Sequence, residues 1–352
     1  RHMSACGNTI AVHHPSLISL TEIDDDSRRD ALPDFSEVRP LREVATMDRA
    51  LPVTTRQLSY TALAHRLHSS AHVVQQEADA EPEGSDGGLT GSPDMEFFDI
   101  ASSAQVGRIV HHVMQYLDMT ASNRAEVVDE LFRSAVRDEG MNPAHFPFRD
   151  AAALVLRSVT APLGAIAGGY ALQDFPPSRV IPEMGFDFVI PQAQSMDTLA
   201  AILRRHLAHD ESFGEWVNAL QIDNATLRGF MTGSLDAVLG WEGDGQPRFC
   251  VVDYKTNRLR NAAGVEEYSA TTMSAAMMHH HYYLQAIFYV VALHRYLRGR
   301  LARYDYATHI SGAAYLFVRG MDPEREGSGV VTLHVPIDLV QDLSAFFDGS
   351  TF

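Results

Sequence analysis

The spacing of apolar and polar residues along the chain predicts several β-strands. Residues 180–191 alternate with a period of two, which places four apolar side chains on one face: Met184, Phe186, Phe188 and Ile190. Two apolar, β-branched runs, 233–239 and 249–255, flank a segment rich in Gly, Asp and Pro at 240–247. This pattern is typical of a β-hairpin. A further strand is expected at 313–318.

Other segments carry apolar residues at helical spacing. In residues 107–117 five of them form a single stripe: Ile109, Val110, Val113, Met114 and Leu117. Similar patterns predict helices at 59–68, 122–158, 195–209, 272–300 and 339–347. Strands and helices therefore both occur along the chain.

Composition divides the chain into a connector and a folded part. Residues 1–56 scatter Pro, Asp and Arg among short apolar pieces, as a connector does. Ordered structure is expected over 57–352. Within it, residues 77–94 are acidic and rich in Gly, Pro and Ser, which predicts a disordered surface loop.

The overall composition is that of a soluble globular protein, with 45% hydrophobic and 21% charged residues. No run of 18 apolar residues occurs, so no membrane span is expected. Cys6 and Cys250 give neither a disulfide framework nor zinc spacing, which favours a reducing, cytoplasmic setting. The net charge of −17 argues against passive coating of a polyanion, yet an enzyme can still gather its arginines along one groove.

The predicted hairpin carries the main chemical signal. Asp253 and Lys255 share one face of their strand, and pairing of the two strands can bring Asp236 close to Asp253. Two carboxylates suit Mg²⁺ or Mn²⁺, and the amine can act as a point charge on a phosphate. Lys255 is the single lysine among 28 basic residues. A lone lysine must fall somewhere, but chance placement here is about a one-in-28 event, which favours a chemical role.

Further candidates are weaker. His111 lies at the margin of the apolar stripe of its helix, whereas His112 points nearly opposite the centre of that stripe and is expected to be solvated. Taken alone, a marginal histidine is more often a packing residue than a ligand. Glu183 and Asp187 face away from the apolar side of their strand, where they can reach the site or be solvated. The run 279–281 of three histidines points in diverging directions on a helix, which argues against a metal site.

Four motifs and their order along the chain resemble the C-terminal nuclease domain of the RecB family, within the PD-(D/E)xK nuclease superfamily. They are Gly233-Ser-Leu-Asp236, Val252-Asp-Tyr-Lys-Thr-Asn257, Gln285-Ala-Ile-Phe-Tyr289 and Leu293-His-Arg-Tyr-Leu-Arg298. The resemblance covers roughly residues 57–350. It implies an α/β, restriction-endonuclease-like core, with a central mixed β-sheet flanked by helices and additional helical elements. Residues 1–56 are then expected to lead from an upstream helicase region.

Matched residue by residue, the resemblance implies a site for Mg²⁺, or Mn²⁺ in its place. Its expected ligands are His111, Asp236, Asp253 and the backbone carbonyl of Tyr254. Lys255 matches the catalytic lysine, which acts with Asp236 and Asp253. Gln285 and Tyr289 match a motif beside the DNA and are expected to position the strand. The identity of a fourth carboxylate, Glu183 or Asp187, stays open.

The activity that the resemblance implies is that of a Mg²⁺-dependent nuclease of exodeoxyribonuclease V type, acting mainly on single-stranded DNA in double-strand-break processing and recombinational repair. Its implied partners are the helicase part of the same polypeptide, RecC- and RecD-like subunits and a recombinase, at the bacterial nucleoid. The alternative is a non-catalytic docking module that recruits the recombinase or partner subunits, since an acidic surface suits a basic protein. The intact set of His111, Asp236, Asp253 and Lys255 argues for catalysis.

Overall fold

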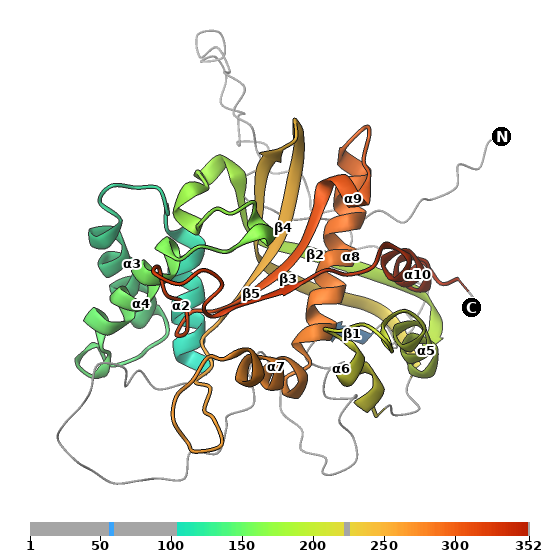
Figure 1. Ribbon diagram of the computed structural model, residues 1–352, viewed down its shortest axis with the longest axis horizontal. Helices are drawn as coiled ribbons and strands as arrows, with labels where there is room; N and C mark the ends of the chain where they lie inside the picture. The colour runs from blue at the N-terminus through green and yellow to red at the C-terminus, as the bar shows by residue number, and fades with distance from the viewer. Residues whose placement is uncertain (1–55, 60–103, 222–225, 351–352) are drawn as a thin grey trace, which may run out of the picture.

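The computed structural model describes residues 56–59, 104–221 and 226–350 (Figure 1). The acidic segment 77–94, the expected helix beyond Ser59 and nearly all of the connector lie outside these residues. Ser59, the expected cap of that helix, is the last residue of a strand. In the described part of the chain, no helix is long and apolar enough to cross a membrane.

A six-stranded mixed β-sheet runs through the centre of the molecule (Figure 1). Its strands are β1 (Arg56–Ser59), β2 (Val180–Ser195), β3 (Thr226–Gly243), β4 (Gln246–Lys255), β5 (Ile310–Phe317) and β6 (Val330–Leu333). The order is β1-β3-β4-β5-β6, and β2 also pairs with β3. The β1–β3 and β4–β5 pairs are parallel and the other pairs are antiparallel. The α/β class with a mixed sheet is therefore confirmed.

Strand β3 has two successive partners along one of its edges. β2 pairs with the other edge over most of its length. On the shared edge, β4 pairs with residues 237–243 and β1 with residues 229–232. β4 leaves this edge after the pair Ala237–Val252, because its last residues pair only with β5. The sheet therefore forks directly beyond that pair.

Helices cover both faces of the sheet (Figure 1). One face carries α2 (Ala104–Tyr116), α3 (Arg124–Asp138) and α4 (Phe148–Thr160). The other carries α5 (Met196–Leu207), α6 (Gly214–Ala219), α7 (Ala270–His279), α8 (Tyr282–Arg300) and α10 (Ile337–Phe347). The short helix α9 (Tyr306–His309) precedes β5, and 3-10 turns lie at Pro143–His145, Ala165–Ala167, Leu172–Asp174 and Pro177–Arg179. Each face encloses its own hydrophobic core.

The strands follow the predicted pattern, with longer bounds. The four apolar residues predicted to share a face of β2 are all buried in the core beside α8 and α10. The hairpin forms, but its turn is only Asp244-Gly245, whereas the sequence predicted 240–247. Both turn residues have positive φ, 51° and 71°, which suits the right-handed twist of two strands joined by a two-residue turn.

Two predicted helices are each divided in the structure. The segment 122–158 forms α3 and α4, separated at 139–147 by a stretch that contains Pro143 and Pro147. The segment 272–300 forms α7 and α8, because His281 takes a left-handed conformation with φ of 53°. The helices expected at 107–117, 195–209 and 339–347 are confirmed within a few residues.

Candidate active site

The two predicted aspartates lie at the fork in the sheet. Asp236 directly precedes Ala237 and Asp253 directly follows Val252, the last pair between β3 and β4. The backbone N–H of Tyr254 donates a hydrogen bond of 2.7 Å to Oδ2 of Asp236. This bond spans the opening between the strands. The side chain of Asp236 therefore links β3 to β4 where backbone hydrogen bonds between them have ended.

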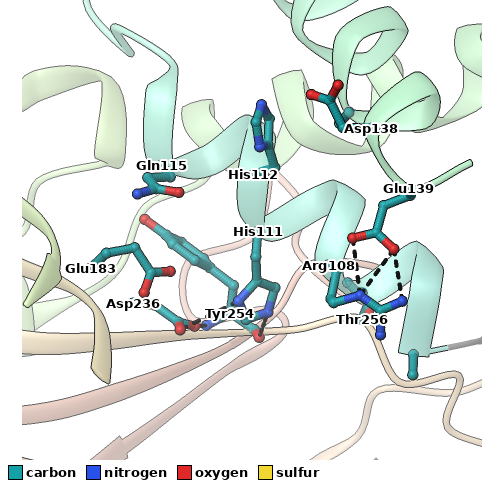
Figure 2. A pocket seen from close by; sticks show the side chains of 13 residues that line it. Arg108, His111, His112, Gln115, Asp138, Glu139, Glu183, Asp236, Tyr254 and Thr256 are labelled. Atoms are coloured by element: carbon teal, nitrogen blue, oxygen red, sulfur yellow. Dashed lines mark hydrogen bonds and ion pairs between the residues drawn. The ribbon is translucent and has the colours of Figure 1, made fainter. Parts of the chain in front are cut away.

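Helix α2 brings His111 to the same point. Its Nδ1 lies 3.3 Å from Oδ1 of Asp236, and its Nε2 lies 2.8 Å from the carbonyl oxygen of Tyr254. Figure 2 shows the imidazole of His111 directed from α2 toward Asp236 and Tyr254. Three of the four predicted ligand groups, namely His111, Asp236 and the Tyr254 carbonyl, therefore converge.

Glu183 of β2 completes this cluster. Its position in the β2–β3 register is opposite Asp236, and Oε2 accepts a hydrogen bond of 2.7 Å from Ser234 Oγ. Ligand atoms of His111, Glu183 and Asp236 all lie within 4.8 Å of one another, the only such group of three in the described residues. Asp187 pairs with Thr232, further along the strands, and does not belong to the group. The geometry thus selects Glu183 from the two candidates.

A backbone irregularity gives Glu183 this position. Its φ is 47°, in the left-handed region that side chains rarely adopt. Ile181 and Met184, which are three residues apart, consequently both pack on the core beside α8, although a regular strand would place them on opposite faces. The sequence carries no signal for this change of face.

His111 and Asp236 each favour the charged form of the other. Burial lowers the pKa of His111, but the charge of Asp236 and the contact between them outweigh it and raise the pKa to about 9. For Asp236, burial favours the neutral form, yet His111, Lys255 and the Tyr254 N–H hold the pKa below its ordinary value. Burial raises the pKa of Glu183. One imidazole nitrogen, two carboxylates and a carbonyl oxygen fit a divalent cation, which would replace the imidazolium proton.

Asp253 and Lys255 lie on the other side of β4, as the predicted alternation requires. Asp253 is 1% and Lys255 5% exposed, and Nζ of Lys255 lies 3.0 Å from Oδ2 of Asp253. Burial raises the pKa of Asp253, while the lysine opposes that shift. The carboxylate of Asp253 is outside the group formed by His111, Glu183 and Asp236. The predicted metal ligands therefore lie in two groups. His111, Asp236 and the Tyr254 carbonyl lie together, whereas Asp253 contacts Lys255.

Gln285 and Tyr289 of α8 are buried beneath the site. Nε2 of Gln285 donates to the hydroxyl of Tyr289 at 2.9 Å, and the hydroxyl of Tyr315 donates to Oε1 of Gln285 at 3.0 Å. Tyr289 is only 5% exposed, and neither residue lines the cavity that opens over the cluster. Both were expected beside the DNA. In the structure they are linked through Tyr315, whose ring lies 5.6 Å from Nζ of Lys255.

A cavity of about 480 Å³ opens over the cluster between α2, α3 and the sheet (Figure 2). The lining includes His111, Glu183, Asp236, Tyr254, Thr256, Arg108, His112, Gln115, Asp138 and Glu139. Arg108 binds Glu139 through two nitrogens, with distances of 2.7 and 3.0 Å. His112, expected to be solvated, lines the cavity. Sequence patterns gave no indication of Arg108 or Glu139, because their pairing depends on how α2 packs on α3.

Residues 86–343 match the model of the PD-(D/E)XK nuclease superfamily. The chain therefore belongs to this superfamily of metal-dependent nucleases. It is similar to RecB in particular, which confirms the resemblance found in the sequence. It is 31% identical over 268 residues to the RecBCD enzyme subunit RecB of Mycolicibacterium smegmatis, a match that covers 71% of this chain and 24% of the relative.

Two further RecB subunits show similar matches. The Escherichia coli subunit is 36% identical over 125 residues, 36% of this chain and 10% of the relative. The Haemophilus influenzae subunit is 28% identical over 259 residues, 74% of this chain and 20% of the relative. The chain thus matches a quarter or less of the length of these relatives.

Proposed function

We propose that this chain is the Mg²⁺-dependent nuclease domain of a RecBCD-type helicase–nuclease and hydrolyses phosphodiester bonds in single-stranded DNA. The observation that carries the proposal is the convergence of His111, Glu183 and Asp236 at the fork between β3 and β4, where the carbonyl of Tyr254 lies 2.8 Å from His111. The membership of the PD-(D/E)XK superfamily supports it. Single-stranded DNA is the form that the helicase of such an enzyme delivers.

His111, Glu183, Asp236 and the Tyr254 carbonyl would hold the cation, which we propose to be Mg²⁺ with Mn²⁺ as a substitute. Hard oxygen ligands together with one imidazole suit either ion. A divalent cation at this place supplies Lewis-acid chemistry, which polarises the phosphodiester and favours its attack by water. The resemblance to RecB adds Asp253 to the ligand set.

Lys255 contributes a fixed positive charge to the reaction. It is close enough to the cluster for its charge to act on both Asp236 and His111. The lysine helps to lower the pKa of Asp236, and it opposes part of the rise in the pKa of His111. Negative charge grows on the phosphate as water attacks, and a pre-positioned ammonium stabilises that charge without reorganising. We propose that Lys255 has this role and orients the attacking water. Gln285 and Tyr289, buried behind it, act by positioning the site rather than by stacking on bases.

The biological setting is proposed from the similarity to RecB. The domain would act in double-strand-break end processing and recombinational repair, in the bacterial cytoplasm at the nucleoid. Its partners would be the helicase part of the same polypeptide, RecC- and RecD-like subunits and a recombinase. The enzyme would be of exodeoxyribonuclease V type.

Incubation of the purified chain with end-labelled single-stranded DNA across a Mg²⁺ titration tests the proposal. We expect cleavage that rises with Mg²⁺, stops with a chelator and leaves 5′-phosphate and 3′-hydroxyl ends. A parallel reaction on duplex DNA tests the substrate preference. Absence of cleavage at every Mg²⁺ concentration, or cleavage that persists in the chelator, would overturn the proposal.

A further inference from the structure

The ammonium group of Lys255 lies between a carboxylate and an aromatic surface. The side chain is almost fully buried, and a buried charge is costly unless its surroundings compensate for the lost water. Oδ2 of Asp253 meets Nζ at 3.0 Å. Nζ also lies 3.8 Å from the centroid of the Tyr282 ring and 5.6 Å from that of Tyr315. Both distances fall within the range of cation–π attraction, which is strongest where water is excluded.

The two rings are themselves held in place. They are stacked on each other, with centroids 5.8 Å apart and an angle of 30°. The Tyr282 hydroxyl donates to Oδ1 of Asn257 at 3.2 Å, and the Tyr315 hydroxyl donates to Gln285 at 3.0 Å. Tyr315 is the register partner of Asp253 in the β4–β5 pair, so the ring and the carboxylate come from neighbouring strands. The surface that the ammonium meets is therefore rigid.

The break between α7 and α8 determines where Tyr282 lies. His281 takes φ of 53° and Tyr282 is the first residue of α8. Tyr282, Gln285 and Tyr289 follow at intervals of three and four residues, which places them on one face of the helix. The same helix thus supplies the ring that meets Nζ and the amide that fixes Tyr315.

We propose that Tyr282 is a positioning residue for the nuclease reaction. The π face of its ring holds the ammonium of Lys255 beside the strand fork. This inference rests on the proposed function. It also accounts for the single lysine of the chain, because a compact ammonium fits between a ring face and a carboxylate, whereas the planar guanidinium of arginine is larger and presents a fork of donors. The functional part of Tyr282 is then the ring and not the hydroxyl.

A substitution series at position 282 separates these features. Tyr282→Phe keeps the ring and gives up the hydroxyl bond to Asn257, so it should retain kcat within about twofold. Tyr282→Leu removes the π face and should lower kcat at least about tenfold, with KM for single-stranded DNA and Mg²⁺ affinity unchanged. Tyr283→Leu is the matched control. Tyr283 is equally buried, but its ring packs on Phe213 and Trp216.

A second readout does not depend on activity. Protein labelled with ¹³C-lysine gives one ε-methylene signal, because Lys255 is the only lysine. The ring of Tyr282 should shift this signal upfield in the wild type, in Tyr282→Phe and in Tyr283→Leu. The shift should be lost in Tyr282→Leu. An unshifted wild-type signal would contradict the contact itself.

Fluorinated phenylalanines at position 282 keep the proposal testable if Tyr282→Leu fails to fold. Each added fluorine weakens the negative face of the ring while the ring stays in place. We expect kcat to fall stepwise with the number of fluorines. Equal kcat across this series, or equal losses in Tyr282→Leu and Tyr283→Leu, would overturn the positioning role while the nuclease assignment stands. A wild-type chain that never cleaves DNA would instead overturn the nuclease assignment and the positioning role together.

Discussion

Asp236 accepts a hydrogen bond of 2.7 Å from the backbone N–H of Tyr254, across the point where β3 and β4 separate. This contact explains how one carboxylate can serve both the fold and the site. Oδ2 accepts the N–H of Tyr254 in place of a backbone carbonyl of β3, because β3 and β4 no longer pair at this point. Oδ1 lies 3.3 Å from Nδ1 of His111. The fork therefore exposes a carboxylate, an imidazole and a carbonyl oxygen to the same cavity.

Asp236→Asn should sharply reduce cleavage, and above about pH 9, where the ion pair with His111 no longer contributes, it should have little effect on stability. The amide oxygen of asparagine can still accept the bond from Tyr254, but the charge that favours a divalent cation is gone. We expect cleavage to fall roughly 10²-fold or more. Cleavage assays and calorimetric titration with Mn²⁺ check this, and the midpoint of thermal unfolding serves as the control for folding. Retained Mn²⁺ binding with normal affinity would contradict the role of Asp236 as a ligand.

Glu183 and Asp187 should differ sharply in their effect on metal binding. Glu183 belongs to the cluster and Asp187 does not. Glu183→Gln should weaken Mn²⁺ binding about 10- to 100-fold, while Asp187→Asn, the matched control on the same strand, should leave it unchanged. Equal losses in the two variants, measured by calorimetry, would show that the left-handed turn at Glu183 does not define the site.

The pKa of His111 predicts how stability depends on pH when metal is absent. This pKa is raised from 6.5 to about 9, so the contact with Asp236 contributes stability that is fully present below about pH 6.5. That contribution is lost as the pH rises through about 9. It is lost again in acid, as Asp236 takes up a proton below its ordinary pKa.

Urea unfolding of the wild type and of His111→Gln in a chelator, across the range of pH, measures this difference. The free energies of unfolding should differ most between about pH 5 and pH 6.5 and should converge above pH 9. A difference that grows with rising pH has the wrong sign and would show that His111 is neutral in the fold. Added Mg²⁺ should displace the proton, so its apparent affinity should rise with pH below about 9.

Lys255→Arg should lose most activity although it keeps the charge. A guanidinium in place of the ammonium must fit between Asp253 and the ring of Tyr282, and its planar fork does not match that space. We expect a decrease in kcat of roughly 10²-fold or more, comparable with loss of one oxyanion-hole donor. Mn²⁺ binding should survive, since the side chains of His111, Glu183 and Asp236 are untouched. Near wild-type kcat in Lys255→Arg would remove the lysine from the charge-stabilising role.

The sequence predicted those parts of the site that depend on local periodicity. The period of a strand places Asp253 and Lys255 on one face, and the period of a helix places His111 at the edge of the apolar stripe. The structure agrees with both. The two-residue turn was also open to prediction, because Asp-Gly between two apolar runs is a strong hairpin signal. The wider turn expected at 240–247 overlooked Asp244-Gly245.

Other parts of the site depend on tertiary pairing and had no local signal. The fork arises because β1 and β4 share one edge of β3. The sequence of these strands does not predict that shared pairing. Glu183 reaches the cluster through a left-handed backbone that the strand pattern does not reveal. Gln285 and Tyr289 were expected beside the DNA; the burial of both depends on how α8 packs, with Gln285 bonded to Tyr315 and the ring of Tyr289 against Phe186.

The place where a metal ion binds defines the proposed nuclease site most directly. Anomalous diffraction from crystals of this chain soaked in Mn²⁺, at a concentration that supports cleavage, locates the ion without reference to activity. The predicted result is a peak between His111, Glu183 and Asp236, about 2.0–2.4 Å from their ligand atoms and from the carbonyl oxygen of Tyr254. The peak should disappear in Asp236→Asn. A peak elsewhere, or no peak at that concentration, would contradict a metal-dependent nuclease site at this fork.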